Sequence, residues 1–351
     1  MEIEIISKET IKPSSPTPSH LKTYKLSALD YMFYPLAGNI QDDLTIDCND
    51  DGAQYIVAKV HRRLDEFLGN PDVKAVNKFL PCEANFSGSS VGSPVTYVQL
   101  NIFECGGIAI GLCISHKILD GAALVVFLKG WTNMASGSPE IVYPNLTAPS
   151  LFPQKVSTLK ETSMGLLMPL LKQGKCTTKR FVFESDSVAK LKAEAIENGF
   201  QRASRLEKSS GLTQIVNLRP KLNQPMSENF IGNLVWLVMA TSDTTHGAWK
   251  ILEDLVEIVS KEAMDFYGFT SLCKLGFYEF DFGWGKPIWI TGIVGDGNPV
   301  FMNMVNMFDM KFGEGIEAWV NLDEAEMEIL VKNEELLAYV SLDPSPIKNG
   351  S

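Results

Sequence analysis

The sequence IAIGLCISHKILDG, residues 108–121, decides the fold because two structural periods meet in it. Its first half alternates large aliphatic residues with smaller ones, which is the period-two pattern of a strand. The large positions are Ile108, Ile110, Leu112 and Ile114. His116 continues that series, so we expect it on the same face at the end of the strand. The following residues, GAALVVFLKGW from 121 to 131, have the pattern of a helix, and Asp120 precedes them at the usual N-cap position.

The chain on either side of this junction alternates strand and helix patterns. Residues 95–103 are β-prone, and the turn composition of 104–107 predicts a hairpin with the next strand. Further strands are predicted at 180–184, 214–218 and 234–239, helices at 187–198, 254–266 and 323–339, and short β runs with glycine turns from 273 to 320. A proline-rich stretch indicates a long connection. We therefore predict an α/β (α+β) fold with an N-terminal domain at 1–143, a crossover connection at 144–178 and a C-terminal domain at 179–351.

The composition is that of a globular protein with a full core. The chain has 351 residues, 45% of them hydrophobic, and a net charge of −11. Such a chain can offset its ordering entropy by burial, which excludes disorder as its main state. The acidic balance argues against nucleic acid and anionic membranes as partners. Six scattered cysteines without a C-x-x-C pair, and an N-terminus without a basic and then apolar leader, lead us to expect a cytoplasmic protein with reduced thiols.

The sharpest chemical feature is the H-x-x-x-D-G of His116, Asp120 and Gly121. Histidine is the usual general base near neutral pH, because its unperturbed pKa lies there. The Asp120 carboxylate either accepts a hydrogen bond from the His116 ring or turns away and caps the following helix. A structural histidine at a strand end is the alternative to a catalytic one. The other three histidines do not stand at metal-ligand spacing, and we expect no metal site.

A second motif, DFGWGKP at 281–287, lies between two β-like runs. Two glycines flanking one tryptophan permit a tight backbone turn with a large anchored ring. The motif lacks the spacing of a phosphate-binding loop, so a structural loop is the better interpretation, with Asp281 available to pair with an arginine. Nucleophile motifs such as G-x-S-x-G are missing from the sequence, which favours direct transfer activated by a histidine over a covalent intermediate.

Taken together, HKILDG and DFGWGKP resemble the motifs of the plant BAHD acyltransferases, which use coenzyme A thioesters. Six further stretches stand in the order of that family: IKPSSPTP at 11–18, FYPLAG at 33–38, DCNDDG at 47–52, FECGG at 103–107, NLRP at 217–220 and GIEAWV at 315–320. The resemblance spans nearly the whole chain. Within the family it is greatest to the alkaloid and terpenoid O-acetyltransferases, the vinorine synthase-like and deacetylvindoline acetyltransferase-like members.

The resemblance implies two chloramphenicol-acetyltransferase-like domains with a solvent channel between them. Acyl-CoA, here acetyl-CoA, would enter as co-substrate from one face, and a hydroxyl of a plant alkaloid or terpenoid from the other. His116 would be the general base, Asp120 would hold local structure, and Gly121 would allow a close backbone approach. The second motif would be structural near the CoA side, through Asp281, Gly283, Trp284 and Gly285. The resemblance assigns no CoA-binding residue, no permanently bound cofactor and no metal, and it implies a monomer.

The chain departs from the family in length, and three places are shortened. They lie between 26–30 and 33–38, between 204–207 and NLRP, and between 234–239 and the residues before DFGWG. Removing a core helix exposes its partner face, and much smaller truncations cost several kcal/mol. Omitted segments, an alternatively spliced product and a true compact variant each explain the shortening. Two alternatives to an active O-acyltransferase therefore stay open: a non-catalytic relative that binds a ligand or partner, and an N-acyltransferase acting on an amine.

Overall fold

The computed structural model describes most of the chain. Outside the description lie residues 14–16, 18, 20–22, 26–33, 43–44, 83–89, 146, 148–150, 152–169, 198–209, 222–225, 244–247, 252–264, 293, 296–298 and 348–351. The three shortened places therefore fall wholly or partly outside it.

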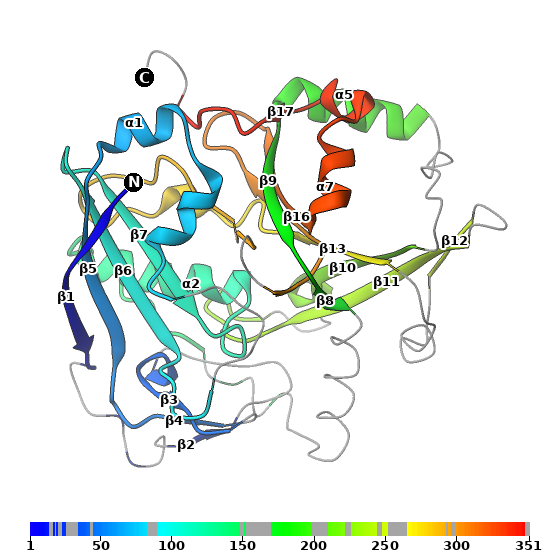
Figure 1. Ribbon diagram of the computed structural model, residues 1–351. Coiled ribbons are helices and arrows are strands. Elements are labelled where there is room, and N and C mark those ends of the chain that lie inside the picture. The colour runs from blue at the N-terminus through cyan, green and yellow to red at the C-terminus, as the bar shows by residue number, and fades with distance from the viewer. Residues whose placement is uncertain are drawn as a thin grey trace.

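Two main β-sheets lie side by side, one from each half of the chain (Figure 1). The N-terminal sheet has the order β1-β5-β6-β7. Its strands are β1 (Ile3–Ile11), β5 (Ala53–Val60), β6 (Thr96–Phe103) and β7 (Ile108–Ile114). β6 is parallel to β5 and antiparallel to β7, so the predicted hairpin is confirmed.

The C-terminal sheet has eight strands in the order β12-β11-β10-β13-β15-β16-β9-β17. They are β9 (Cys176–Phe183), β10 (Ser210–Asn217), β11 (Val235–Asp243), β12 (Ala248–Ile251), β13 (Asp265–Ser271), β15 (Met304–Asp309), β16 (Ile316–Asp323) and β17 (Ser341–Leu342). β13 is parallel to both β10 and β15, and the other neighbours are antiparallel. Two small sheets complete the set: β2 (Thr23–Lys25), β4 (Thr45–Asp47) and β3 (Asn39–Ile40), and β14 (Val300–Phe301) with β8 (Lys172–Gln173).

Three of the four predicted helices lie in the described part of the chain, and one of them is divided in two. The described α-helices are α1 (Leu64–Gly69), α2 (Gly121–Ala135), α5 (Ser185–Glu197), α7 (Glu324–Leu330) and α8 (Glu334–Leu337); the 3-10 helices are η2 (Tyr34–Ala37), η3 (Val73–Phe79), η5 (Arg219–Lys221) and η6 (Phe277–Glu279). The helix predicted at 323–339 is split into α7 and α8. The split occurs because the Asn333 side chain accepts from Leu336 N and caps a second, short helix.

The helix predicted at 254–266 is wrong at its end. Residues 252–264 lie outside the description, and Asp265 and Phe266 begin β13. Along β13, Phe266 and Gly268 are more buried than their neighbours, which is the alternation of a strand covered on one face. Pairing with β10 and β15 on both sides therefore overrides the helical period of the preceding residues.

The two halves share a hydrophobic core. One cluster joins Phe67, Phe79 and Phe103 of the N-terminal half to Phe308 and Trp319 of the C-terminal half. The α/β class is confirmed, while the domain boundaries at 143 and 178 stay predictions. In the described part of the chain, no helix is long and apolar enough to span a bilayer.

Candidate active site

His116 lies in a turn between β7 and α2. β7 ends at Ile114 and residues 116–118 form the turn, so His116 does not continue the strand face as predicted. Ser115 N donates to Val95 O at 3.0 Å, and Ile118 N donates to Ser115 O at 2.9 Å. The Ile118 side chain is fully buried, whereas the His116 side chain is exposed. The turn is therefore anchored by its apolar residue and presents the imidazole outward.

Asp120 turns away from the histidine and caps α2. Its Oδ1 accepts from Ala123 N at 2.9 Å, and its Oδ2 accepts from Leu234 N at 3.0 Å. Arg219 donates to both oxygens, with Nη1 at 2.6 Å from Oδ2 and Nη2 at 3.0 Å from Oδ1. The Asp120 carboxylate therefore binds the N-terminus of α2 and, at the same time, two residues of the C-terminal half. Of the two arrangements open from the sequence, the structure has the capping one.

Arg219, of the NLRP sequence, is a residue that the sequence analysis missed. Besides Asp120 it binds Gly232 O through Nη2 at 2.7 Å, and its guanidinium lies 5.9 Å from the Phe230 ring centroid. The Asp120 and Arg219 side chains are 2% and 15% exposed, so the pair is shielded from solvent screening. Arg219 stands 99 residues from Asp120, a separation that no local pattern reveals.

A further contact from the C-terminal half reaches the histidine itself. Asn233 Nδ2 donates to His116 O at 2.8 Å. Its neighbours Gly232 and Leu234 are bound to Arg219 and Asp120. We call Arg219 and residues 232–234, together with the 116–120 turn that they bind, the seam.

Gly121 allows a close approach between the halves. A Cβ at this position would overlap the Leu272 side chain and lie 3.3 Å from Leu275 Cδ1. Both leucines follow β13, so glycine here lets that segment pack on the first turn of α2. The close approach expected at Gly121 is thus a contact between protein segments.

Cys113 lies three residues before His116 but is a poor nucleophile. A hydrogen bond with the Cys82 thiol and burial raise the pKa of Cys113 well above the ordinary thiol value. A protonated thiol attacks a thioester slowly, because the thiolate is the reactive form. This fits the expectation that the chemistry does not pass through a cysteine.

The DFGWG loop packs on the C-terminal end of α2. Phe282 stacks on Trp284 with centroids 5.4 Å apart and meets the edge of Trp131, of α2, at 5.0 Å. Asp281 Oδ1 accepts from Gly283 N at 2.8 Å and Gly285 N at 3.0 Å. The carboxylate therefore binds backbone amides of its own loop rather than the arginine that the sequence suggested. The two glycines have φ of 97° and 122°, a backbone conformation that few other residues adopt.

The Asp281 contacts predict a pH-dependent loop stability. Hydrogen bonds from the amides of Gly285 and Gly283 lower the pKa of the Asp281 carboxyl. Its stabilising effect is present above the unfolded-state pKa and is lost as the pH falls through the lower folded value. We expect the melting-temperature difference between wild type and Asp281→Ala to be constant from pH 8 to 5 and to shrink below about pH 4. Asp281→Asn, which keeps an oxygen acceptor, should lack this dependence; an unchanged Asp281→Ala difference at pH 3.5 would contradict the assignment.

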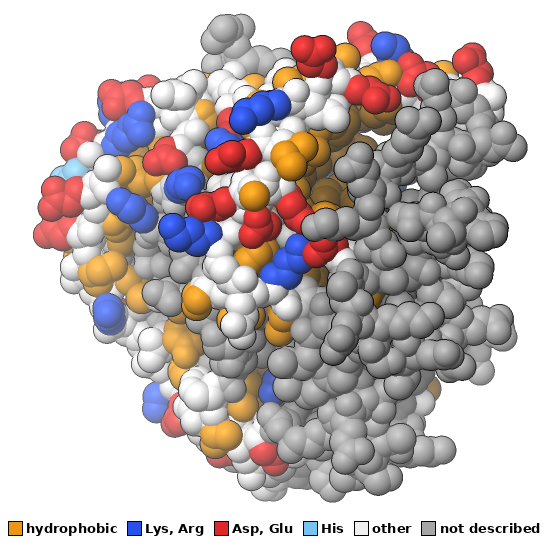
Figure 2. All heavy atoms as spheres, turned by 45° about the vertical axis from the view of Figure 1, so that its right-hand side comes forward, with side chains coloured by type: hydrophobic (Ala, Val, Ile, Leu, Met, Phe, Trp, Pro, Cys, Tyr) orange, Lys and Arg blue, Asp and Glu red, His pale blue; other side chains and the backbone are white. Residues whose placement is uncertain are grey.

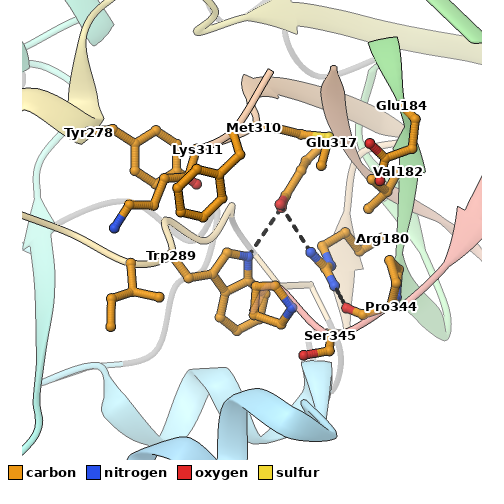
Figure 3. A pocket seen from close by; sticks show the side chains of 13 residues that line it. Arg180, Val182, Glu184, Tyr278, Trp289, Met310, Lys311, Glu317, Pro344 and Ser345 are labelled. Atoms are coloured by element: carbon orange, nitrogen blue, oxygen red, sulfur yellow. Dashed lines mark hydrogen bonds and ion pairs between the residues drawn. The ribbon is translucent and has the colours of Figure 1, made fainter. Parts of the chain in front are cut away.

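A small pocket of about 60 Å³ lies in the C-terminal half, and none of its lining residues belongs to the His116 turn (Figure 3). A buried ion pair forms one wall, with Arg180 Nη1 at 3.1 Å from Glu317 Oε1. Trp289 Nε1 donates to Glu317 Oε2 at 3.2 Å, and Arg180 also donates to Pro344 O. Burial, followed by the nearby Glu317 charge, raises the pKa of Tyr278. These charged groups bind one another and tie β9 to β16.

Charged side chains of both signs are interspersed over the described part of one face (Figure 2). Among the described residues, no group of three His, Cys, Asp or Glu side chains could hold a metal ion.

Comparison with known proteins gives the same family from sequence and from structure. The chain matches the Transferase family over residues 31–208 and 248–337. Akuammiline synthase 2 of Alstonia scholaris is 32% identical, with 98% of each chain covered. Limonoid 7-O-acetyltransferase of Citrus sinensis is also 32% identical, with 99% of this chain and 100% of its own length covered.

Solved structures agree. The crystal structure of vinorine synthase has a TM-score of 0.74 and 27% identity, covering 99% of this chain and 100% of its own. TRI101 of F. graminearum, crystallised with coenzyme A and T-2 mycotoxin, has the same fold, with a TM-score of 0.61, 15% identity and 88% of each chain covered.

The chain lacks internal segments that its relatives have. The alignment with akuammiline synthase 2 is 446 positions long, 95 more than the 351 residues of this chain. The likeness to vinorine synthase nevertheless extends over both halves and supports the two-domain fold. The chain thus belongs to the Transferase family of BAHD acyltransferases, and alkaloid and limonoid acetyltransferases are among its relatives.

Proposed function

We propose that this acyltransferase transfers an acetyl group from acetyl-CoA to a hydroxyl of an alkaloid or terpenoid, with His116 as general base. The observation that carries the proposal is the exposed His116 side chain beside an Asp120 that binds elsewhere. The imidazole is thereby free to meet a substrate. Acetyl as the transferred group is supported by the names of the limonoid and stemmadenine O-acetyltransferases, and CoA as its carrier by the TRI101 complex.

The reaction balances without a covalent enzyme intermediate. His116 removes the proton of the acceptor hydroxyl as the oxygen attacks the thioester carbonyl carbon. A C–O bond forms and the carbonyl becomes a tetrahedral oxyanion, which collapses with cleavage of the C–S bond. The CoA thiolate takes the proton from His116, and the products are an ester and free CoA. A positioned base of this kind contributes about 10²–10⁴-fold to the rate.

The first test is thermal unfolding of the purified chain with and without acetyl-CoA. A ligand that binds only the folded state, at about a hundred times its Kd, should stabilise it by roughly 2.7 kcal/mol. We therefore expect a cooperative transition that moves upward with acetyl-CoA. A screen of alkaloid and terpenoid alcohols for thiol release would then identify the acceptor, with amines included to test N-acylation.

The alternative, a non-catalytic relative, rests on the more than 95 alignment positions that have no residue in this chain. It predicts a folded protein that releases no thiol from acetyl-CoA with any acceptor. A melting temperature that acetyl-CoA does not change would favour the non-catalytic relative over the enzyme.

A further inference from the structure

We propose that Asn233 is a positioning residue for His116, which it holds through the backbone carbonyl of the histidine. This inference rests on the proposed role of His116 as general base. The Asn233 side-chain amide, from the C-terminal half, would thus help to orient the His116 base of the N-terminal half.

The orientation of His116 depends on its backbone. Its side chain is exposed, and no group among the described residues hydrogen-bonds to the ring. The bonds Ser115 N to Val95 O and Ile118 N to Ser115 O hold the turn from the N-terminal half. Among the described residues, the bond from Asn233 Nδ2, at 2.8 Å, is the one hydrogen bond that the C-terminal half makes to residue 116. Losing it would free the carbonyl next to the base.

The chemistry fixes which way the Asn233 amide faces. A backbone carbonyl only accepts hydrogen bonds, so the atom that faces His116 O must be the amide nitrogen. The other amide atom, Oδ1, is buried, and no donor in the described part of the chain reaches it. A buried acceptor without a partner costs about 1–3 kcal/mol, so an apolar side chain would serve folding better. We infer that asparagine is useful here for its N–H.

The main chain around Asn233 is itself held in place. Gly232 O accepts from Arg219 Nη2 at 2.7 Å, and Leu234 N donates to Asp120 Oδ2 at 3.0 Å. Ile231 and Leu234 are both fully buried. The Asn233 side chain therefore starts from a backbone that the Asp120–Arg219 pair fixes on both sides. Small displacements matter at such a place, because a shift of about 1 Å at a reacting group can cost about 10²-fold in rate.

The experiment compares Asn233→Asp and Asn233→Ala with wild type. At neutral pH, aspartate has the shape of asparagine but cannot donate to His116 O. We expect kcat per folded molecule to fall about 10- to 100-fold in both variants, with KM for acetyl-CoA within about threefold of wild type. A role in folding alone would lower the folded fraction and leave kcat per folded molecule unchanged. The folded fraction of each variant is taken from the amplitude of its melting transition in the presence of acetyl-CoA.

Asn229→Asp is the matched control. Asn229 lies in the same loop, where its backbone carbonyl accepts from Asn145 N at 2.8 Å, and its side chain makes no hydrogen bond among the described residues. The same change of an amide to a carboxylate four residues away should leave kcat within about twofold of wild type.

Amide hydrogen exchange gives a readout that does not depend on turnover. Loss of the Asn233 N–H should speed exchange in the 115–119 segment of both Asn233 variants but not in Asn229→Asp. Wild-type kcat in Asn233→Asp, or unchanged exchange of that segment, would overturn the inference. If wild type itself forms no ester, the proposed function fails, and the exchange rates alone decide whether Asn233 holds the turn.

Discussion

His116→Ala should reduce acyl transfer by about 10²–10⁴-fold, the range that a positioned general base contributes. The reason is that the acceptor hydroxyl then has no imidazole to take its proton. The His116 side chain is exposed, so its removal opens no cavity and should leave the melting temperature close to wild type. Acetyl-CoA should still raise the melting temperature, which separates binding from chemistry.

His61→Ala is the control for that substitution. His61 is paired with Glu4 at 3.1 Å on the surface of the N-terminal sheet, and its loss should change neither transfer nor stability measurably. Turnover retained in His116→Ala would remove the histidine from the role of base, whatever the acceptor.

Asp120→Ala should cause the largest loss of stability, about 3–5 kcal/mol in the free energy of unfolding. The substitution leaves the shielded Arg219 guanidinium without its carboxylate and also removes the cap of α2. Urea unfolding with linear extrapolation measures the loss. Activity per folded molecule should fall no further than in the Asn233 variants, about 10- to 100-fold, since Asp120 reaches His116 only through the main chain around Asn233.

Asp323→Ala isolates the capping part of this effect. Asp323 caps α7 by accepting from Ala325 N at 2.9 Å, as Asp120 caps α2. Its loss should cost about 1 kcal/mol, the usual value for a cap. The difference between the two variants then measures the contribution of the Arg219 pair and of Leu234 N. Equal losses would mean that the ion pair contributes nothing.

Local patterns predicted the elements around the site, and tertiary contacts determined what the sequence left open. The β6–β7 hairpin and α2 were predictable because their periods and turn residues are contiguous. The choice of Asp120 between ring and cap was not, because its partners Arg219 and Leu234 stand 99 and 114 residues away. The motifs HKILDG and DFGWG carried the family assignment. The role of Arg219 needed the fold, since nothing in NLRP points to the residue it binds.

The seam also has a consequence for recombining this enzyme with its relatives. Across it, His116, Gly232 and Leu234 take part through main-chain atoms. Proline at 234 would lack the N–H, and the φ of 150° at Gly232 favours glycine. The specific side chains are Asp120 from the first half, and Arg219 and Asn233 from the second. A hybrid that joins the first half of one acetyltransferase to the second half of another should therefore need those three identities to match, in addition to a compatible hydrophobic cluster between the halves.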